Sequence, residues 1–487
     1  MSDLLGIGKT GLFTSKKSME TTGHNISNVN TEGYSRQRAN QTTERSIVQS
    51  GLVKGTGSRI VSVGRIHDDF IEKRLNKELN STEFLKERSG KLEQIESIFN
   101  EVDTEGLNTL LNKFFNSFKE LSGQPENETM KMVVRDNAKI VIRDFQRIQT
   151  TLTNTRKSID QNFKTKIADA NSLINNIAHL NKEIVRIEQL GGESGDLRDG
   201  RDKSIRELSK IFEIHTYVDN RNNFAVAAKG VGTLVVAGEK TDLVAGPATK
   251  DIATNGIDGS FEIFYKDRPG FPITNRFQGG QITSLIKVRN EDIQNISEKI
   301  NNLAYDFAKI VNSIHSKGYV SRKIETDPSG NALPYDKIGK TTGINFFQEP
   351  IRGQDTIEHL SLSEEVLDDP TNICVGLTPN ASGDNRVALA ISKIQHEKLL
   401  NGGTTTIEEE YLHTVSQLGL EAAKSNFDLE QAEGILAQTN NIRERISGVS
   451  LDEETANMMR YQHAYAASAK VMKVAEEMFE TILSIKR

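Results

Sequence analysis

The sequence predicts a mainly α-helical protein with smaller β-rich parts, arranged as an elongated multi-domain rod. Long segments without Gly or Pro carry apolar residues at helical spacing, and both ends of the chain carry heptad repeats. Glycines and prolines concentrate in two stretches between the helical segments. At 487 residues, the chain has room for several domains of about 100–200 residues each.

Composition excludes several classes of protein. The chain has 61 Lys and Arg against 67 Asp and Glu, and the resulting net charge of -6 has the wrong sign for neutralising nucleic-acid phosphates. No apolar run reaches the roughly 18 to 20 residues that span a bilayer, and Lys9 interrupts the short apolar start before it resembles a signal peptide. Cys374 is the only cysteine, so intrachain disulfides and zinc ribbons are excluded. We therefore expect no nucleic-acid partner and no membrane insertion.

The first segment, residues 3 to about 22, predicts a helix with one apolar seam. The seam residues recur every seven positions and are Leu5, Leu12, Met19 and Ile26. Gly6, Gly8 and Gly11 each cost a helix about 0.8 to 1 kcal/mol relative to Ala. This helix is therefore expected to order only against a partner.

The residues after this helix predict successive tight turns. Residues 23–33 combine glycines and asparagines, which tolerate left-handed backbone and form hydrogen bonds between side chain and backbone. The residues expected to shape these turns are Asn25, Asn28, Asn30, Gly33 and Tyr34. An ordinary surface loop is the alternative that the pattern leaves open.

Short β elements are expected at 41–65, followed by helices up to residue 210. Residues 66–121 have a helical pattern that is broken around Gly90 and Gly106. Residues 126–190 contain no Gly or Pro, and a single helix of this length would extend roughly 100 Å. Its apolar stripe is Phe145, Ile148, Leu152, Ile159, Phe163, Ile167, Ala170, Ile174, Ile177, Ile184 and Ile187.

Two insertions interrupt the later helices. Residues 211–279 are glycine-rich and hold short β-branched and aromatic runs, which are typical of strands: Ile211–Val218, Phe224–Ala228, Thr233–Val236 and Phe261–Tyr265. Residues 319–384 hold five of the nine prolines and 11 acidic against 5 basic residues, which predicts an irregular, acidic insertion with little helix. Between them, residues 281–317 carry Ile286, Ile293, Ile300, Phe307 and Ile314 on strict sevens.

The C-terminal segment predicts a second helix with a heptad seam. Ser450 and Glu453 have the spacing of a helix-capping box, and neither Gly nor Pro follows Leu451. The seam residues are Met458, Tyr465, Met472 and Phe479. Two heptad-bearing ends that enclose a large middle are expected to meet as a helical pair.

These patterns divide the chain into four parts. They are a terminal helical assembly domain (1–40 plus 447–487), a helical rod domain (41–210 plus 280–318 plus 385–446), a β-rich inserted domain (211–279) and an irregular or β acidic insertion (319–384).

Motifs for catalysis are incomplete. Gly6 to Gly11 fits G-x-G-x-x-G, but too few residues precede it for the strand that a nucleotide-binding fold requires. His396-Glu397 would begin a zinc-protease motif, but Leu400 stands at the position of the second histidine. The nine histidines include no pair spaced for a metal site on one helix face. We therefore expect no enzyme activity, cofactor or metal.

Two segments resemble the ends of a known family: TTGHNISNVNTEGYSRQ (21–37) and SGVSLDEETANMMRYQHAYAASAKVMKVAEEMFETIL (447–483). They resemble the bacterial flagellar hook-associated protein 1 family, whose members form the hook–filament junction. NISNVNT followed by GY is shared by flagellar rod, hook and junction proteins. The continuation YSRQ after Gly33, together with LDEE at 451–454 and RYQ at 460–462, is what resembles the junction family. Glu32 departs from the proline common in the family, and His463 departs from the common Gln.

The resemblance implies a structural role at the junction of hook and filament. The protein would be extracellular, part of the flagellum and exported by the flagellar type III apparatus without a cleaved signal peptide. Its terminal helices would pack with those of neighbouring copies in a ring-like oligomer. The other implied partners are the hook protein, a neighbouring hook-associated protein and an export chaperone.

Two alternatives remain at this point. A flagellar hook or rod protein would share the N-terminal motif, although such extensive helices are not expected of it. A cytoplasmic coiled-coil scaffold would share the heptads, and cell fractionation separates it from a flagellar protein.

Overall fold

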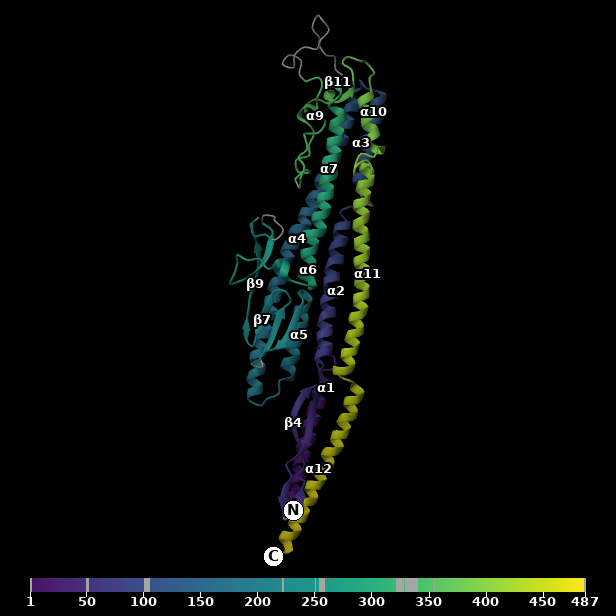
Figure 1. Ribbon diagram of the computed structural model, residues 1–487. Coiled ribbons are helices and arrows are strands. Elements are labelled where there is room, and N and C mark those ends of the chain that lie inside the picture. Colours follow the sequence, from purple (N-terminus) through teal and green to yellow (C-terminus); the bar gives the residue numbers. More distant parts are fainter. Residues whose placement is uncertain are drawn as a thin grey trace. The chain divides into compact units, whose positions relative to one another are not determined.

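The computed structural model describes residues 2–49, 52–99, 106–220, 223–249, 251–253, 259–320, 328, 340–353 and 355–485. It is mainly α-helical with small antiparallel sheets, so the predicted fold class is confirmed (Figure 1). Contacts divide the chain into two compact units. The first contains Met1–Phe84, Phe163–Thr283 and Leu429–Arg487, and the second contains Leu85–Asn162 and Ser284–Asp428. The four-part division expected from the sequence stays a prediction.

The first unit contains the paired ends of the chain. Helix α1 (Ser2–Ser27) packs against helix α12 (Leu451–Ile485) (Figure 1). Gly8 faces Met472, Gly11 faces Ser468 and Asn25 faces Glu454. Residue numbers therefore increase along α1 in the direction in which they decrease along α12. The two helices are therefore antiparallel, and the predicted pairing is confirmed. Helix α1 extends to Ser27, past the expected end near residue 22.

A β-hairpin lies along α1. Strand β1 (Gln37–Thr43) pairs antiparallel with β4 (Ser58–Arg65), and the short strands β2 (Ile47–Gln49) and β3 (Leu52–Lys54) pair between them. The expected β elements at 41–65 are therefore confirmed, with the first strand beginning earlier, at Gln37.

The rest of the first unit combines helices with the inserted β region. A four-stranded antiparallel sheet has the order β5 (Ile214–Val218), β6 (Phe224–Ala228), β7 (Gly232–Val236) and β8 (Glu239–Lys240). Strand β9 (Leu243–Pro247) pairs with β10 (Phe261–Tyr265), and the 3-10 turn η1 (Thr274–Arg276) follows. The predicted strands are confirmed, although the first begins at Ile214 because Ile211 ends helix α5 (Gly195–Ile211). Side-chain and backbone hydrogen bonds between Asn171 and Leu243 tie helix α4 (Glu128–Gln189) to strand β9.

The second unit is a helical assembly around an aromatic core. Its elements are α3 (Leu107–Gly123), the π-helical segment η2 (Val288–Asp292), α7 (Ile293–His315), β11 (Tyr319–Val320), α9 (Glu364–Asp368), η3 (Pro370–Asn372), β12 (Cys374–Gly376), α10 (Arg386–Lys393) and η4 (Ile394–His396). Helices α2 (Asp69–Glu96), α4, α6 (Gly280–Lys287) and α11 (Ile407–Ser447) contribute residues to both units. The core rings are Phe114, Phe115, Phe118, Phe145, Phe307, Phe346 and Phe347, all buried.

Most helical stripes behave as predicted. Ten of the eleven stripe residues named in 126–190 are buried, from Phe145 to Ile184, as are Ile293, Ile300 and Phe307 on α7. Two details differ. Gly90 lies inside α2 because a single glycine weakens a helix without ending it, and 281–317 is interrupted by η2. In 319–384 the described residues contain little helix, and 321–327, 329–339 and 354 lie outside them.

Candidate functional site: the terminal helix pair and its polar junction

The predicted seam residues all lie on the two helices of the terminal pair. Leu5, Tyr465 and Phe479 are 40%, 40% and 52% exposed. The other five are half-buried: Leu12, Met19, Ile26, Met458 and Met472. None of the eight residues is fully buried in the single chain.

The buried face of α1 within the single chain is largely polar. Its buried residues include Thr14, Ser15, Ser18, Thr21 and Thr22. Thr14 donates to the carbonyl of Ser58 over 3.1 Å, and Gln41 donates to the Ser18 hydroxyl over 2.9 Å, so the hairpin satisfies this face. Short hydroxyl side chains also bond within the helix, as Thr21 does to the carbonyl of Lys17.

Two glycines allow α12 to approach this helix closely. A Cβ atom on Gly8 would lie 2.6 Å from Cγ of Met472, and a Cβ on Gly11 would lie 2.6 Å from Oγ of Ser468. Residues larger than glycine would therefore separate the helices. The glycines lower the intrinsic helix propensity, as expected, but their absence of side chains is also what permits the pairing.

The terminal pair exposes many large apolar side chains. They are Leu4, Leu5, Ile7 and Phe13 on α1, and Leu451, Met459, Tyr465, Val471, Val474, Phe479, Ile482 and Leu483 on α12. Contiguous exposed apolar surface marks sites of protein–protein contact. These exposed side chains therefore make the terminal pair a candidate site of contact with other chains.

Asn25 joins the end of α1 to the chain that follows it and to α12. Its side-chain amide exchanges two hydrogen bonds of 2.9 Å with the backbone of Gln37. Its oxygen also accepts from the Tyr34 hydroxyl over 2.9 Å, and its nitrogen donates to Glu454 over 3.2 Å. The side chain is 1% exposed, so each of these bonds replaces a lost bond to water.

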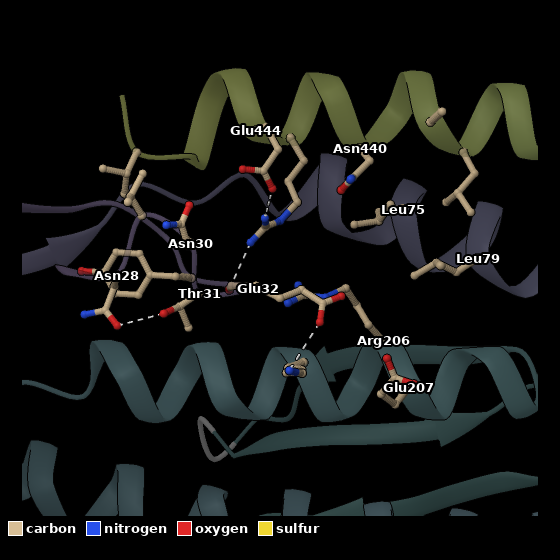
Figure 2. A pocket seen from close by; sticks show the side chains of 18 of the residues that line it. Asn28, Asn30, Thr31, Glu32, Leu75, Leu79, Arg206, Glu207, Asn440 and Glu444 are labelled. Atoms are coloured by element: carbon tan, nitrogen blue, oxygen red, sulfur yellow. Dashed lines mark hydrogen bonds and ion pairs between the residues drawn. The ribbon is translucent and has the colours of Figure 1, made fainter. Parts of the chain in front are cut away.

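The other predicted turn residues act in different ways. Asn28 donates to the carbonyl of His24 and accepts from the Thr31 hydroxyl, which closes the turn (Figure 2). Gly33 has φ of +81°, a left-handed conformation that favours glycine, and a Cβ there would also strike the Arg206 guanidinium. Asn30 is exposed at the surface of the turn. The surface-loop alternative therefore does not describe Asn25, Gly33 or Tyr34.

Acidic residues at the start of α5 hold the chain after the turn. Asp199 accepts from the backbone nitrogen of Ser35 over 2.9 Å and from Arg65 over 2.6 Å. Asp196 accepts from the Gln37 side chain over 2.7 Å. Burial, together with Asp196 and Asp199, raises the pKa of the Tyr34 phenol well above its usual value, so Tyr34 stays protonated and donates to Asn25.

Two further carboxylates tie α12 and α11 to this junction. Glu454 at the start of α12 is buried and pairs with Arg36 over 2.6 Å. Glu72 on α2 pairs with Arg206 over 2.9 Å and with Arg443 over 2.8 Å. Breaking one partner of such buried pairs is strongly destabilising, because the other charge is left uncompensated.

The sequence reasoning missed these ionic residues. The GDLRDGRD segment at 195–202 has no local pattern that marks this role, yet it supplies Asp196 and Asp199. Glu453 was expected in a capping box with Ser450, but its carboxylate pairs with Arg36 instead. Glu72 and Arg443 gave no local signal, because isolated charges on helices are usually solvated.

A pocket of about 540 Å³ adjoins the turn (Figure 2). Residues 28–34 close one end of it, and Leu75 and Leu79 of α2 point into it. Helix α5 contributes Arg206 and Glu207 to one side, and helix α11 contributes Asn440 and Glu444 to the other. The volume is within the range of about 300–1,000 Å³ that is typical of binding pockets.

Membrane and metal features were also searched over the part of the chain that the structure describes. There, none of the helices has both the length and the apolar character needed to cross a bilayer. The same residues contain no group of three His, Cys, Asp or Glu side chains placed to hold a metal ion.

Two protein-family models match the chain. The "Flagellar hook-associated protein FlgK helical domain" matches residues 92–328, and the "Flagellar basal body rod FlgEFG protein C-terminal" matches residues 444–485. The second match covers nearly all of helix α12.

Several relatives match along almost their whole length. Flagellar hook-associated protein 1 of Bacillus subtilis (strain 168) is 28% identical over 509 residues, which cover 99% of this chain and 97% of the relative. Proteins of the same name from Salmonella typhimurium and Escherichia coli are 22% and 21% identical over 100% of both chains. The solved flagellar hook junction protein FlgK from Burkholderia pseudomallei shares the fold, with a TM-score of 0.62 and 13% identity over 77% of this chain and 100% of that chain.

Both family models describe flagellar proteins, one of the hook-associated class and the other of the basal-body rod class. The full-length matches specify the family further. The chain is similar over almost its whole length to proteins of the flagellar hook-associated protein 1 family.

Proposed function

We propose that this protein is a structural component of the bacterial flagellum that joins the hook to the filament and assembles through its terminal helices. The observation that carries the proposal is the terminal pair of α1 and α12, which is packed within one chain yet exposes apolar residues on both helices. The full-length relatives named flagellar hook-associated protein 1 support the location at the junction.

The proposed partners follow from this role. Copies of the chain associate in a ring-like oligomer, with the hook protein on one side and a neighbouring hook-associated protein on the other. The eight seam residues, Leu5 to Ile26 and Met458 to Phe479, take part in the assembly interface. The turn residues from Asn25 to Tyr34 hold the helix pair in place for it. The role is structural and requires neither catalysis nor a cofactor.

The proposed location is outside the cell. The chain reaches it through the flagellar type III apparatus without a cleaved signal peptide, kept from premature association by an export chaperone. Such a chaperone could bind the exposed apolar residues of α12, which include Val474 and Phe479.

Deleting the chain tests the proposal. Cells that lack it should carry hooks without filaments and shed filament protein into the medium, and the intact chain supplied in trans should restore motility. Electron microscopy of the cell surface and immunoblots of the medium measure both. Filaments of normal length in the deletion strain would refute the junction role.

Cell fractionation tests the alternatives. A junction protein should be recovered with sheared and purified flagella, whereas a cytoplasmic coiled-coil scaffold should stay in the cytosol. A hook or rod protein would leave deletion cells without complete hooks, which the same micrographs distinguish from hooks that merely lack filaments.

A further inference from the structure

The pocket beside the turn has an apolar floor and is open to solvent. Leu75 and Leu79 of α2 form one part of this floor, and Leu436 and Ala437 of α11 form the other. Leu79 and Leu436 are only half-buried in the single chain, and Ala437 is exposed. Filling the pocket with apolar side chains would therefore remove further apolar surface from water.

One rim of the pocket carries an uncompensated negative charge. Glu433 lies on α11 beside the floor, and the described residues provide it with neither a hydrogen bond nor an ion pair. Glu444, on the same helix, is already paired with Arg443, and Lys203 on α5 is paired with Glu32 (Figure 2). An occupant that adds a single positive charge next to Glu433 would complement this rim.

The first turns of α1 have matching properties. Leu4, Leu5 and Ile7 are 41%, 40% and 37% exposed at the end of this helix. Lys9 follows one turn after Leu5, and within the described part of the chain it has no ion-pair partner, only a distant contact with the Phe13 ring. The helix end therefore presents three apolar side chains and one free positive charge.

This helix end cannot reach the pocket of its own chain. Asn28 is the pocket residue nearest to Leu5 in the sequence, and the two are 23 positions apart, with all the residues between them in α1. At 1.5 Å per residue the helix holds the two roughly 35 Å apart. Any contact between them must therefore join two copies of the chain.

We propose that the pocket receives the first turns of α1 from a second copy of this chain. Leu4, Leu5 and Ile7 of that copy lie on the apolar floor, and Lys9 of that copy lies beside Glu433. The proposal rests on the proposed function, because it specifies a contact by which the terminal domains associate. The contact joins different surfaces of the two copies, so it continues into a ring or a helical array and does not stop at a dimer.

Cysteine cross-linking in assembled flagella tests this contact. In a Cys374→Ser background, Leu5→Cys is combined with Asn440→Cys, a pocket residue on α11. Oxidation of purified flagella that contain the chain should give covalent dimers, trimers and longer products. The control combines Leu5→Cys with Gln438→Cys, which is exposed on the same helix and outside the pocket, and it should give none.

Blocking the pocket provides a second readout. Ala437→Phe fills the floor, whereas Gln438→Phe places the same ring next to it on the exposed surface. We expect Ala437→Phe to reduce incorporation into flagella by about tenfold or more, with Gln438→Phe close to the unchanged chain. Circular dichroism of the purified chains should be the same for both.

The outcomes separate this proposal from the proposed function. If flagella contain the chain but yield no products from the Leu5→Cys and Asn440→Cys pair, the pocket contact is wrong and the junction role stands. Products that contain one copy of the chain joined to a different protein would overturn the assignment of a second copy. Absence of the chain from purified flagella would refute the proposed function and this contact together.

Discussion

The aromatic core of the second unit and the terminal helix pair of the first unit use opposite means of packing. The core gathers seven buried phenylalanines, with rings such as Phe114 and Phe307 5.4 Å apart in an edge-to-face arrangement. The terminal pair buries threonines, serines and Asn25 instead, and leaves many of its large apolar residues exposed. The second unit thus has an aromatic core that is buried within one chain, whereas the terminal pair leaves many large apolar side chains exposed, as the proposed association with other chains requires.

The largest effect is expected in the aromatic core. Phe307→Ala should lower the free energy of unfolding by about 3–5 kcal/mol, because Phe307 is fully buried and the truncation leaves a cavity. Denaturant titration of the purified chain measures this. Phe427→Ala is the matched control in the same unit, since Phe427 is 59% exposed and its loss should change stability by no more than about 0.5 kcal/mol. Similar losses of unfolding free energy in Phe307→Ala and Phe427→Ala would show that the aromatic core does not stabilise the second unit in this way.

Acid should weaken the second unit before the terminal pair. His315 is fully buried, and burial lowers its pKa to about 4 despite its hydrogen bond to the carbonyl of Ile344. The unfolded chain takes up a proton at the ordinary pKa of about 6.5, so stability is lost as the pH falls from 6.5 towards 4, by about 3 kcal/mol in total. Denaturant titrations at pH 7 and pH 4.5 measure the loss. His315→Gln, which removes the ring that takes up the proton, should abolish this loss of stability between pH 7 and pH 4.5.

Asn25→Ala should have an intermediate and local effect. The substitution removes the hydrogen-bond partner of the Gln37 backbone and of the Tyr34 hydroxyl, and these groups stay buried. We expect the free energy of unfolding to fall by about 2 kcal/mol. Hydrogen exchange should accelerate at the end of α1 and the start of α12 and remain slow in the second unit. Asn30→Ala, at an exposed position of the same turn, should exchange like the unchanged chain. Equal exchange in both variants would show that Asn25 does not hold the junction.

The smallest effect on the isolated chain is expected at Phe479. Because its ring is 52% exposed, Phe479→Asp should change the melting temperature of the purified chain little. Assembly should nevertheless fail, since a charge would enter an apolar contact between chains. Swimming assays and electron microscopy of flagella measure this. Normal swimming by cells that export the variant would remove Phe479 from the proposed interface.

Much of the fold could be predicted because its signals are local. Long stripes such as Phe145 to Ile184 repeat at helical spacing, and the two terminal heptads predicted that α1 and α12 meet. The polar packing of α1 could not be predicted in this way. Thr14 and Ser18 have the spacing of a buried face but the chemistry of a solvated one, and only the hairpin that covers them decides between the two.

The ionic part of the site could not be predicted, because its partners are far apart in the chain. Glu72 and Arg443 are separated by 371 positions, and Asn25 and Glu454 by 429. Neither pair has a local pattern that marks it. Gly33 and Tyr34 were predicted as turn residues, but their contacts with Arg206 and Asn25 depend on the tertiary fold.

The antiparallel pairing of the two ends has a consequence for the order of synthesis. Gly8 and its partner Met472 are far apart in the sequence. Helix α1 can therefore pair with α12 only after the ribosome has synthesised the residues between them. Closing so long a loop is only modestly harder than closing a short one, since each doubling of loop length costs about 0.6 kcal/mol. A prematurely terminated product, however, has no α12 at all. A chain truncated before Leu451 therefore leaves α1 without the helix that it packs against.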